Sequence, residues 1–145
     1  MKVVFSKKIE KFFLPLANEA KACYNIVAWA RRGKVMVYCM KLQHRPFLLI
    51  KSGRKTIEMR LYDDKRKTLK VGDMVEFTDV KTGETLVCEV VKLHIYPTFD
   101  ELYKNHDKIS IGYEEDEIAH PKDMLAYYSQ DEIAKYGVVG IEIKK

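Results

Sequence analysis

The clearest pattern along the chain is a strict alternation of polar and apolar residues from Thr56 to Leu61. Alternation with a period of two predicts a half-buried β-strand with opposite faces. The polar face carries Thr56, Glu58 and Arg60, and the apolar face carries Ile57, Met59 and Leu61. Similar segments predict four further strands, at residues 35–42, 74–80, 85–96 and 138–145. Because Gly83 lies in the connection 81–84, the strands on either side of it are expected to form a hairpin.

Helix signals fall between these strands. Pro46 stands at the first turn of a short apolar helix that Ser52-Gly53 ends, and residues 98–101 and 129–132 have the spacing of capping boxes. The other predictions are a helix at 19–30, a helical turn at 114–117, a helix at 121–128 and a charged loop at 63–67. Because the predicted strands carry polar faces, we expect an α+β fold: a small antiparallel or mixed β-barrel with flanking short helices.

The composition is that of an ordinary globular domain: 145 residues, 47% hydrophobic and 32% charged. No stretch approaches the roughly 18 apolar residues of a membrane helix, so we expect no membrane partner. The apolar run at 12–17 is short and contains Pro15, which argues against an export signal. Three cysteines without a CxxC pair indicate reduced thiols, so we expect a cytoplasmic protein.

Charge is unevenly distributed. Residues 41–70 carry ten Lys or Arg and three Asp or Glu, a balance of +7, whereas residues 100–132 carry three and ten, a balance of −7. Residues 1–39 add eight basic and two acidic side chains. A basic segment is a candidate surface for phosphate-bearing partners, because local potential attracts them. The other interpretation is that the two opposite segments neutralise each other in the fold.

The strongest candidate chemistry lies in Gly53-x-Lys55-x-x-Glu58-x-Arg60. Gly53 allows a sharp backbone turn into the strand, which then presents a carboxylate and a guanidinium beside the Lys55 amine. Such a group could bind an anion, position a water or move a proton. The alternative is a solvated strand face with a Glu–Arg pair of little energetic consequence.

This segment resembles the GxKxxExR signature of the ASCH domain, a PUA-like β-barrel family. The resemblance extends to the flanking segments, which follow in a family-like order: Pro46-Phe47, residues 61–66, the turn at 70–73, the helix start at 97–102, residues 123–128 and the last strand from Tyr136 to Ile141. It covers residues 40–145. We therefore expect an ASCH/PUA-like domain at 40–145 and a basic N-terminal extension at 1–39. Met40 is a possible alternative start codon, and a chain that starts there would lack this extension.

The resemblance implies a module that binds RNA or a modified nucleoside in a cleft lined by the signature. Lys55 and Arg60 would contact phosphate or a ligand carbonyl, and Glu58 would accept hydrogen bonds from a base edge or orient Arg60. Tyr128 could stack on a base. The remaining expected contacts come from Arg54 and Thr56, with salt-dependent affinity from Lys51 and residues 65–67. We expect no cofactor and no metal, because the four histidines are scattered without ligand spacing.

Two alternatives remain open. The first is a small hydrolase, because some similar proteins look like amidohydrolases that deacylate acetylcytidine, and another branch has been proposed to cleave RNA. Those deacylases have a threonine where this chain has Glu58, and a separate glutamate that could correspond to Glu114, Glu115 or Glu117. Lys55 and Glu58 would then be catalytic, although a neighbouring carboxylate favours a charged lysine over a basic one. The second is an interaction domain in which residues 1–39 add a helix to a partner.

Overall fold

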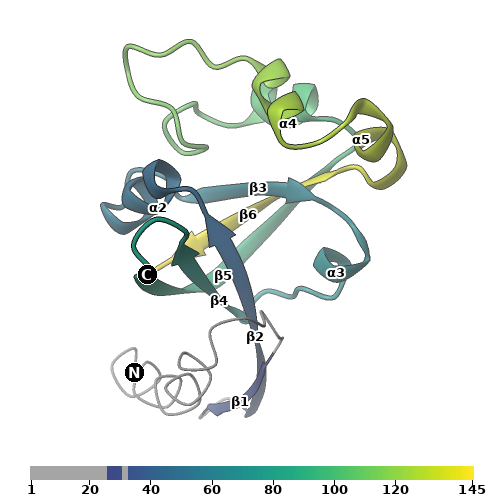
Figure 1. The fold of residues 1–145 in the computed structure, drawn as a ribbon. Helices are drawn as coiled ribbons and strands as arrows, with labels where there is room; N and C mark the ends of the chain where they lie inside the picture. Colours follow the sequence, from purple (N-terminus) through teal and green to yellow (C-terminus); the bar gives the residue numbers. More distant parts are fainter. Residues whose placement is uncertain (1–25, 31–32) are drawn as a thin grey trace.

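One curled, six-stranded sheet in the order β1-β2-β4-β5-β6-β3 forms the body of the molecule (Figure 1). The computed structural model describes residues 26–30 and 33–145. The strands are β1 (Ile26–Ala30), β2 (Gly33–Leu42), β3 (Ile57–Leu61), β4 (Met74–Asp79), β5 (Thr85–Tyr96) and β6 (Val138–Lys144). The final strand, β6, lies between β5 and β3.

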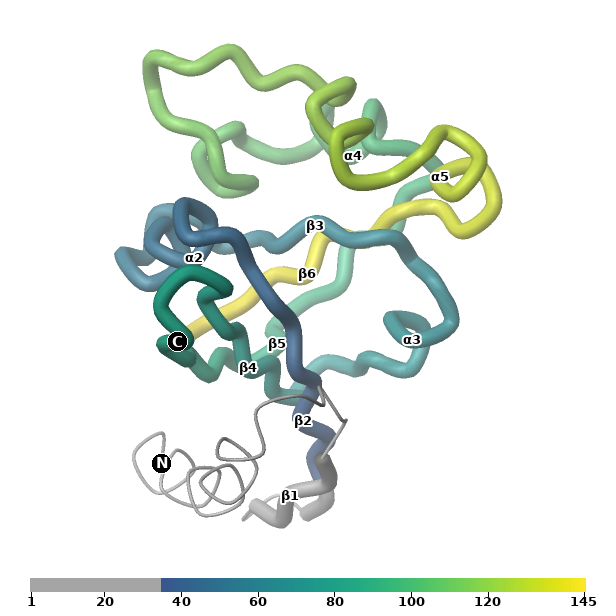
Figure 2. The backbone as a smooth tube through the Cα atoms, viewed as in Figure 1, coloured from purple at the N-terminus to yellow at the C-terminus, as the bar shows by residue number. Residues whose placement is uncertain are grey.

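The sheet is mixed, because β2 and β4 pair in parallel and the other neighbours pair antiparallel. The predicted hairpin between β4 and β5 is confirmed. The curl of the whole sheet brings β3 close to the end of β2 (Figure 2). There a side chain spans the gap between the two strands, since Arg60 Nη2 donates a hydrogen bond to the Lys41 carbonyl oxygen at 2.8 Å. The expected mixed barrel of the α+β class is therefore confirmed as a curled, partly open barrel.

Short helices connect the strands. They are α2 (His44–Lys51), α3 (Asp64–Lys67), α4 (Phe99–Asn105), the 3-10 helix η1 (Pro121–Ala126) and α5 (Gln130–Tyr136). The Thr98 side chain caps α4 by accepting from the Glu101 N–H, and Ser129 and Glu132 form the complete predicted capping box of α5. Within the described residues, every helix is too short or too polar to reach across a membrane.

Two apolar cores lie on opposite faces of the sheet. The first fills the barrel and includes Tyr38, Phe47, Phe77 and Ile141. The second lies between the sheet and the segment that holds α4, η1 and α5, and it includes the apolar face of β3. As a result β3 is covered on both sides, and its polar face points into the barrel instead of into solvent.

Three local predictions are wrong. Residues 26–30 form β1 instead of the end of a helix, because their backbone pairs with β2; residues 19–25 lie outside the described residues. The expected loop at 63–67 contains α3, whose first turn is capped by the Asp63 carboxylate accepting from the Arg66 N–H at 3.0 Å. Residues 114–117 form a turn without a helix, because Lys108 Nζ donates hydrogen bonds to the carbonyl oxygens of Glu115 and Glu117, each at 2.7 Å.

Candidate functional site

The signature places three charged side chains in one cluster on the barrel side of β3. Lys55 Nζ donates to Glu58 Oε1 at 2.9 Å, and Arg60 donates to Glu58 Oε2 from Nη2 at 3.0 Å and from Nε at 3.3 Å. The Met59 N–H also donates to Glu58 Oε1, at 3.1 Å. We call Lys55, Glu58 and Arg60 the ion cluster. Its carboxylate accepts four hydrogen bonds, and both of its oxygens are engaged.

The ion cluster is largely shielded from water. The side chains of Lys55, Glu58 and Arg60 are 7%, 5% and 16% exposed. Burial alone would raise the pKa of Glu58, but the charges and hydrogen bonds of Lys55 and Arg60 lower it to about 2. Burial works against the charged form of Arg60 too, yet Glu58 and other nearby groups raise the pKa of its guanidinium. The cluster therefore holds two cations and one ionised carboxylate.

The loop 107–113 supports the cluster from the other side. The Ser110 carbonyl oxygen accepts from the Thr56 and Ile57 N–H groups at 3.0 and 2.9 Å, which fixes the loop against the start of β3. Gly112 then lies against the Lys55 side chain with φ +113°, and a Cβ there would stand 3.1 Å from Lys55 Cδ. Only glycine is readily accommodated at such a position. No local pattern indicates that Gly112 belongs to the site, because its contact with Lys55 joins residues far apart in the chain.

The other predicted ligand residues, Arg54, Thr56 and Tyr128, make their main contacts outside the ion cluster. Arg54 points to the loop instead and pairs with Glu115 at 2.7 Å. Thr56 is partly buried and lines, with Lys55, a cavity of about 180 Å³ beside the end of β6. Tyr128 is partly buried, and its ring stacks on Phe99 with centroids 6.1 Å apart.

Tyr128 nevertheless lies close enough to the cluster to interact with its charges. Burial raises the pKa of the Tyr128 hydroxyl, while the positive charge of Arg60 lowers it and the negative charge of Glu58 raises it. The neighbouring Tyr127 is the more open of the two rings, at 63% exposed. An aromatic surface offered to a ligand would therefore come from Tyr127 more readily than from Tyr128.

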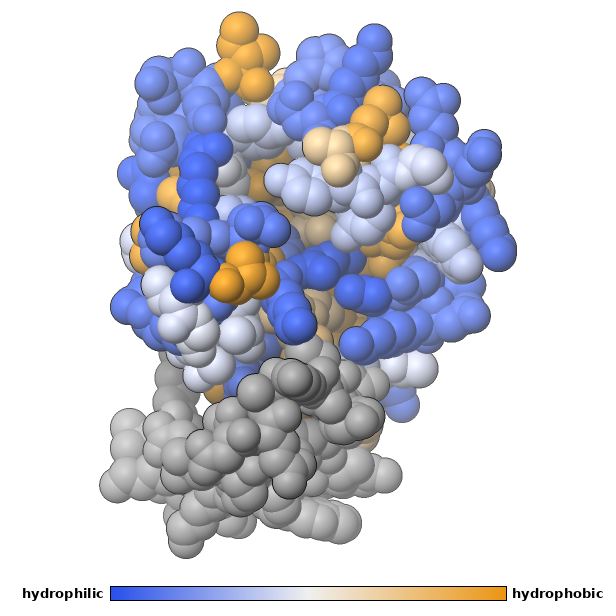
Figure 3. Space-filling model, in the orientation of Figure 1, coloured by the Kyte–Doolittle hydropathy of each residue, from blue (hydrophilic) through white to orange (hydrophobic). Residues whose placement is uncertain are grey.

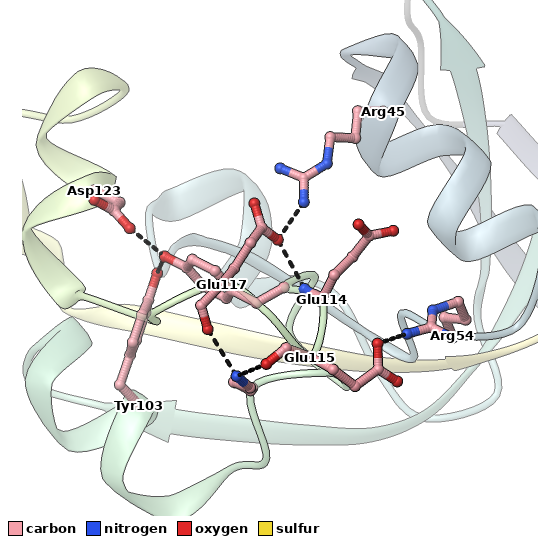
Figure 4. Close-up of polar contacts among 9 residues, drawn as sticks. Arg45, Arg54, Tyr103, Glu114, Glu115, Glu117 and Asp123 are labelled. Atoms are coloured by element: carbon pink, nitrogen blue, oxygen red, sulfur yellow. Dashed lines mark hydrogen bonds and ion pairs between the residues drawn. The ribbon is translucent and has the colours of Figure 1, made fainter.

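Acidic groups already pair with several basic side chains that were expected to contact phosphate. Arg54 pairs with Glu115 of the turn at 114–117, and Arg45, which the sequence does not single out, pairs with Glu117 of the same turn (Figure 4). Three more basic groups, Lys51, Arg66 and Lys67, pair with Glu84, Asp63 and Asp64. The opposite charge blocks of the sequence thus meet in the fold, and part of the basic surface is neutralised internally.

The histidines do not assemble around the ion cluster. His94 pairs with Glu142 at 2.7 Å and meets His106 edge to face, with ring centroids 4.4 Å apart. Gly140 lies between Ile57 and His94, which places His94 on the face of the sheet opposite to Glu58. In the part of the chain that the structure describes, no three His, Cys, Asp or Glu side chains come together as a metal site.

Comparison with known proteins identifies this arrangement. The family model of the ASCH domain matches residues 40–145, which include the ion cluster and the loop that supports it. The chain belongs to the ASCH domain family. The match confirms the family that the signature resembles, and this ASCH domain has the mixed, PUA-like barrel fold expected of it.

Two solved structures are similar to this ASCH domain. A crystal structure of the hypothetical protein PH0355 has 32% sequence identity and a TM-score of 0.64, covering 75% of this chain and 98% of that one. A solution NMR structure of protein PF0455 from Pyrococcus furiosus has 33% identity and a TM-score of 0.60, covering 75% and 96%. No curated protein matches the chain.

Proposed function

We propose that this ASCH domain binds RNA or a modified nucleoside at the ion cluster. The observation that carries the proposal is the excess positive charge of a shielded site, where two cations share one carboxylate. Charges interact more strongly where water is excluded, so a phosphate or a polarised carbonyl near the cluster is stabilised more than it would be on the open surface. Membership in a family of generally RNA-binding domains supports the same class of ligand.

The three members of the cluster would have different roles. Arg60 is the most open, so its guanidinium would meet the ligand first. Lys55 Nζ has three protons, and its hydrogen bond to Glu58 leaves donor capacity for a ligand oxygen. Glu58 would hold both cations in place. On the face shown in Figure 3, hydrophilic side chains rim a hollow whose floor is partly apolar, and a ligand would enter from this face.

Tyr127 would add a sequence-tolerant contact to this electrostatic one. Its exposed ring follows η1, next to the partly buried Tyr128 that lies within range of the Arg60 charge. Stacking of a base on an aromatic ring contributes about 1–3 kcal/mol. We therefore expect Tyr127→Ala to weaken binding of a single-stranded RNA by about fivefold or more, and Tyr127→Phe to preserve it.

The geometry favours binding over hydrolysis. A general base works best with a pKa near the operating pH, and the pKa of Glu58 lies at about 2, which makes it a weak base. Lys55 would need to be a neutral amine to act as a base, yet it lies 2.9 Å from an ionised carboxylate. Glu58 also occupies the place of the threonine hydroxyl in the deacylases that the signature resembles.

RNA affinity measured by fluorescence anisotropy tests this proposal. We expect Lys55→Met and Arg60→Gln each to weaken binding of a short single-stranded RNA by about tenfold to a hundredfold, the range for a hydrogen bond to a charged group. Lys81→Met is the matched control, because it removes one charge from the exposed β4–β5 turn. Wild-type affinity should also fall as salt rises.

A second variant separates loss of binding from loss of folding. Lys55→Met combined with Glu58→Gln removes both charges of the buried pair and leaves similar volumes, so this variant should fold while binding RNA weakly. Affinity like that of the wild type in folded Lys55 and Arg60 variants would remove the cluster from the binding site. Turnover of acetylcytidine or of labelled RNA by the wild type would instead support the hydrolase alternative.

A further inference from the structure

A turn of acidic residues lies over two arginines at the edge of the candidate site. We call residues 114–117 the acidic turn, and Arg45 and Arg54 the arginine pair. Glu117 accepts from Arg45, and Glu115 accepts from Arg54 Nη2 at 2.7 Å (Figure 4). Arg45 lies in the first turn of α2, and Arg54 directly precedes Lys55. The acidic turn therefore pairs with two cations, one of which, Arg54, directly precedes a member of the ion cluster in the chain.

The two carboxylates are held in these positions by several specific contacts. Lys108 Nζ binds the carbonyl oxygens of Glu115 and Glu117, and the Glu114 N–H donates to Glu117 Oε2 at 2.7 Å. The preceding loop is fixed to β3 through the Ser110 carbonyl oxygen. The loop that packs on Lys55 through Gly112 thus continues into the turn that positions the two carboxylates beside the arginine pair.

These ion pairs differ from the ion cluster in exposure. The side chains of both pairs are 33–74% exposed, whereas those of the ion cluster are 5–16% exposed. Mutual hydrogen bonds raise the pKa of each arginine and lower the pKa of Glu115 and Glu117, so all four groups are charged at neutral pH. Exposed pairs of this kind are weak, and another anion can replace the carboxylate at small cost.

Carboxylate and phosphate oxygens fit a guanidinium in the same forked geometry. From this we infer that the arginine pair is a phosphate-binding site, and that RNA phosphates displace Glu115 and Glu117 from it when RNA binds. The acidic turn then competes with the nucleic acid and lowers its affinity. This inference rests on the proposed function. It concerns RNA with a phosphate backbone and does not concern a free nucleoside, which offers nothing to exchange with the carboxylates.

The test removes the competing charges while it keeps their shape. Glu115→Gln combined with Glu117→Gln should strengthen binding of a short single-stranded RNA by about three- to tenfold in fluorescence anisotropy. Plots of log affinity against log salt should become steeper by up to about 1.4, corresponding to two phosphate contacts at about 0.7 each. Affinity for acetylcytidine, a nucleoside without phosphate, should stay the same.

Two further variants control for unspecific charge effects. Glu114→Gln combined with Asp116→Asn removes the same two charges from the same turn without breaking a side-chain ion pair to an arginine, and it should change RNA affinity by less than about twofold. Adding Arg45→Gln and Arg54→Gln to the Glu115→Gln/Glu117→Gln variant should cancel its gain. In the wild-type background the two arginine substitutions should cost less than about threefold.

Three outcomes would overturn the inference. Equal gains from the two acidic double variants would show that only the general electric field matters. If RNA affinity is unchanged in Glu115→Gln/Glu117→Gln while binding still depends on Lys55, the acidic turn does not compete with RNA. The proposed function would then stand without this inference. Absence of RNA binding by the wild type and by every variant would contradict both the proposed function and this inference.

Discussion

Replacing Glu58 by glutamine tests the physical reasoning behind the ion cluster most directly. The substitution keeps the volume but leaves Lys55 and Arg60 as two buried cations without an anion. A glutamine also has one acceptor oxygen, whereas the two carboxylate oxygens accept from Lys55 and the Met59 N–H on one side and from Arg60 on the other. One set of donors therefore loses its acceptor.

The structure gives an approximate magnitude for this loss. The pKa of Glu58 falls from its ordinary value of 4.5 to about 2, and each unit corresponds to about 1.36 kcal/mol. The ionised carboxylate therefore contributes about 3 kcal/mol relative to its protonated form, in line with the 3–5 kcal/mol that breaking a buried ion pair costs. We expect Glu58→Gln to lower the free energy of unfolding by about 3 kcal/mol at pH 7.

Urea denaturation across a range of pH provides the assay. Because the folded-state pKa is depressed, the stabilisation is complete well above pH 4.5 and is lost as pH falls towards 2. At pH 3, about 2 kcal/mol of the difference between wild type and Glu58→Gln should have disappeared. Glu101→Gln, an exposed control, should stay within about 0.5 kcal/mol of the wild type. A Glu58→Gln protein within 1 kcal/mol of wild type at pH 7, or a difference that does not shrink in acid, would refute the reasoning.

Three other predictions concern stability. Gly112→Ala should cost about 1–3 kcal/mol in urea unfolding, because φ is +113° and the new Cβ would crowd Lys55; unchanged stability would contradict this. Burial raises the pKa of Glu76 to about 7, so wild-type stability should fall as pH rises from 4.5 to 7, and Glu76→Gln should be about 1–3 kcal/mol more stable at pH 8; identical pH profiles would contradict it. We propose that the ASCH domain spans residues 40–145 and that residues 1–39 are an extension of it. A chain that starts at Met40 nevertheless lacks the buried Tyr38, so it should lose at least about 3 kcal/mol of stability in thermal or urea unfolding. Equal stability would make residues 1–39 a dispensable appendage.

Local signals in the sequence were enough to predict most of the barrel. Alternation in β3, the glycine-containing hairpin between β4 and β5 and the capping box at Ser129 each depend on residues close together in the chain. The parity of β3 also places Glu58 and Arg60 on one face, and the structure has them there. These features could be predicted because strand pleating and helix capping are determined within a few residues.

Long-range contacts explain what the sequence could not show. Residues 19–30 are predicted to form a helix, but pairing with β2 decides the conformation of residues 26–30. The polar face of β3 looks solvated in the sequence, yet the curl of the sheet turns it into the barrel. Ion pairs such as Arg45–Glu117 join positions 72 residues apart, and no local pattern distinguishes them from other surface charges.

The central position of β6 has a consequence for how the protein is made. β3 carries the signature, and its partner in the sheet is β6 (Val138–Lys144), which follows much later in the sequence. A nascent polypeptide still attached to the ribosome has synthesised every member of the ion cluster long before it can complete the ladder that holds them. Assembly of the binding residues should therefore wait until β6 has been synthesised, and a chain truncated before Val138 should leave them on an unpaired strand.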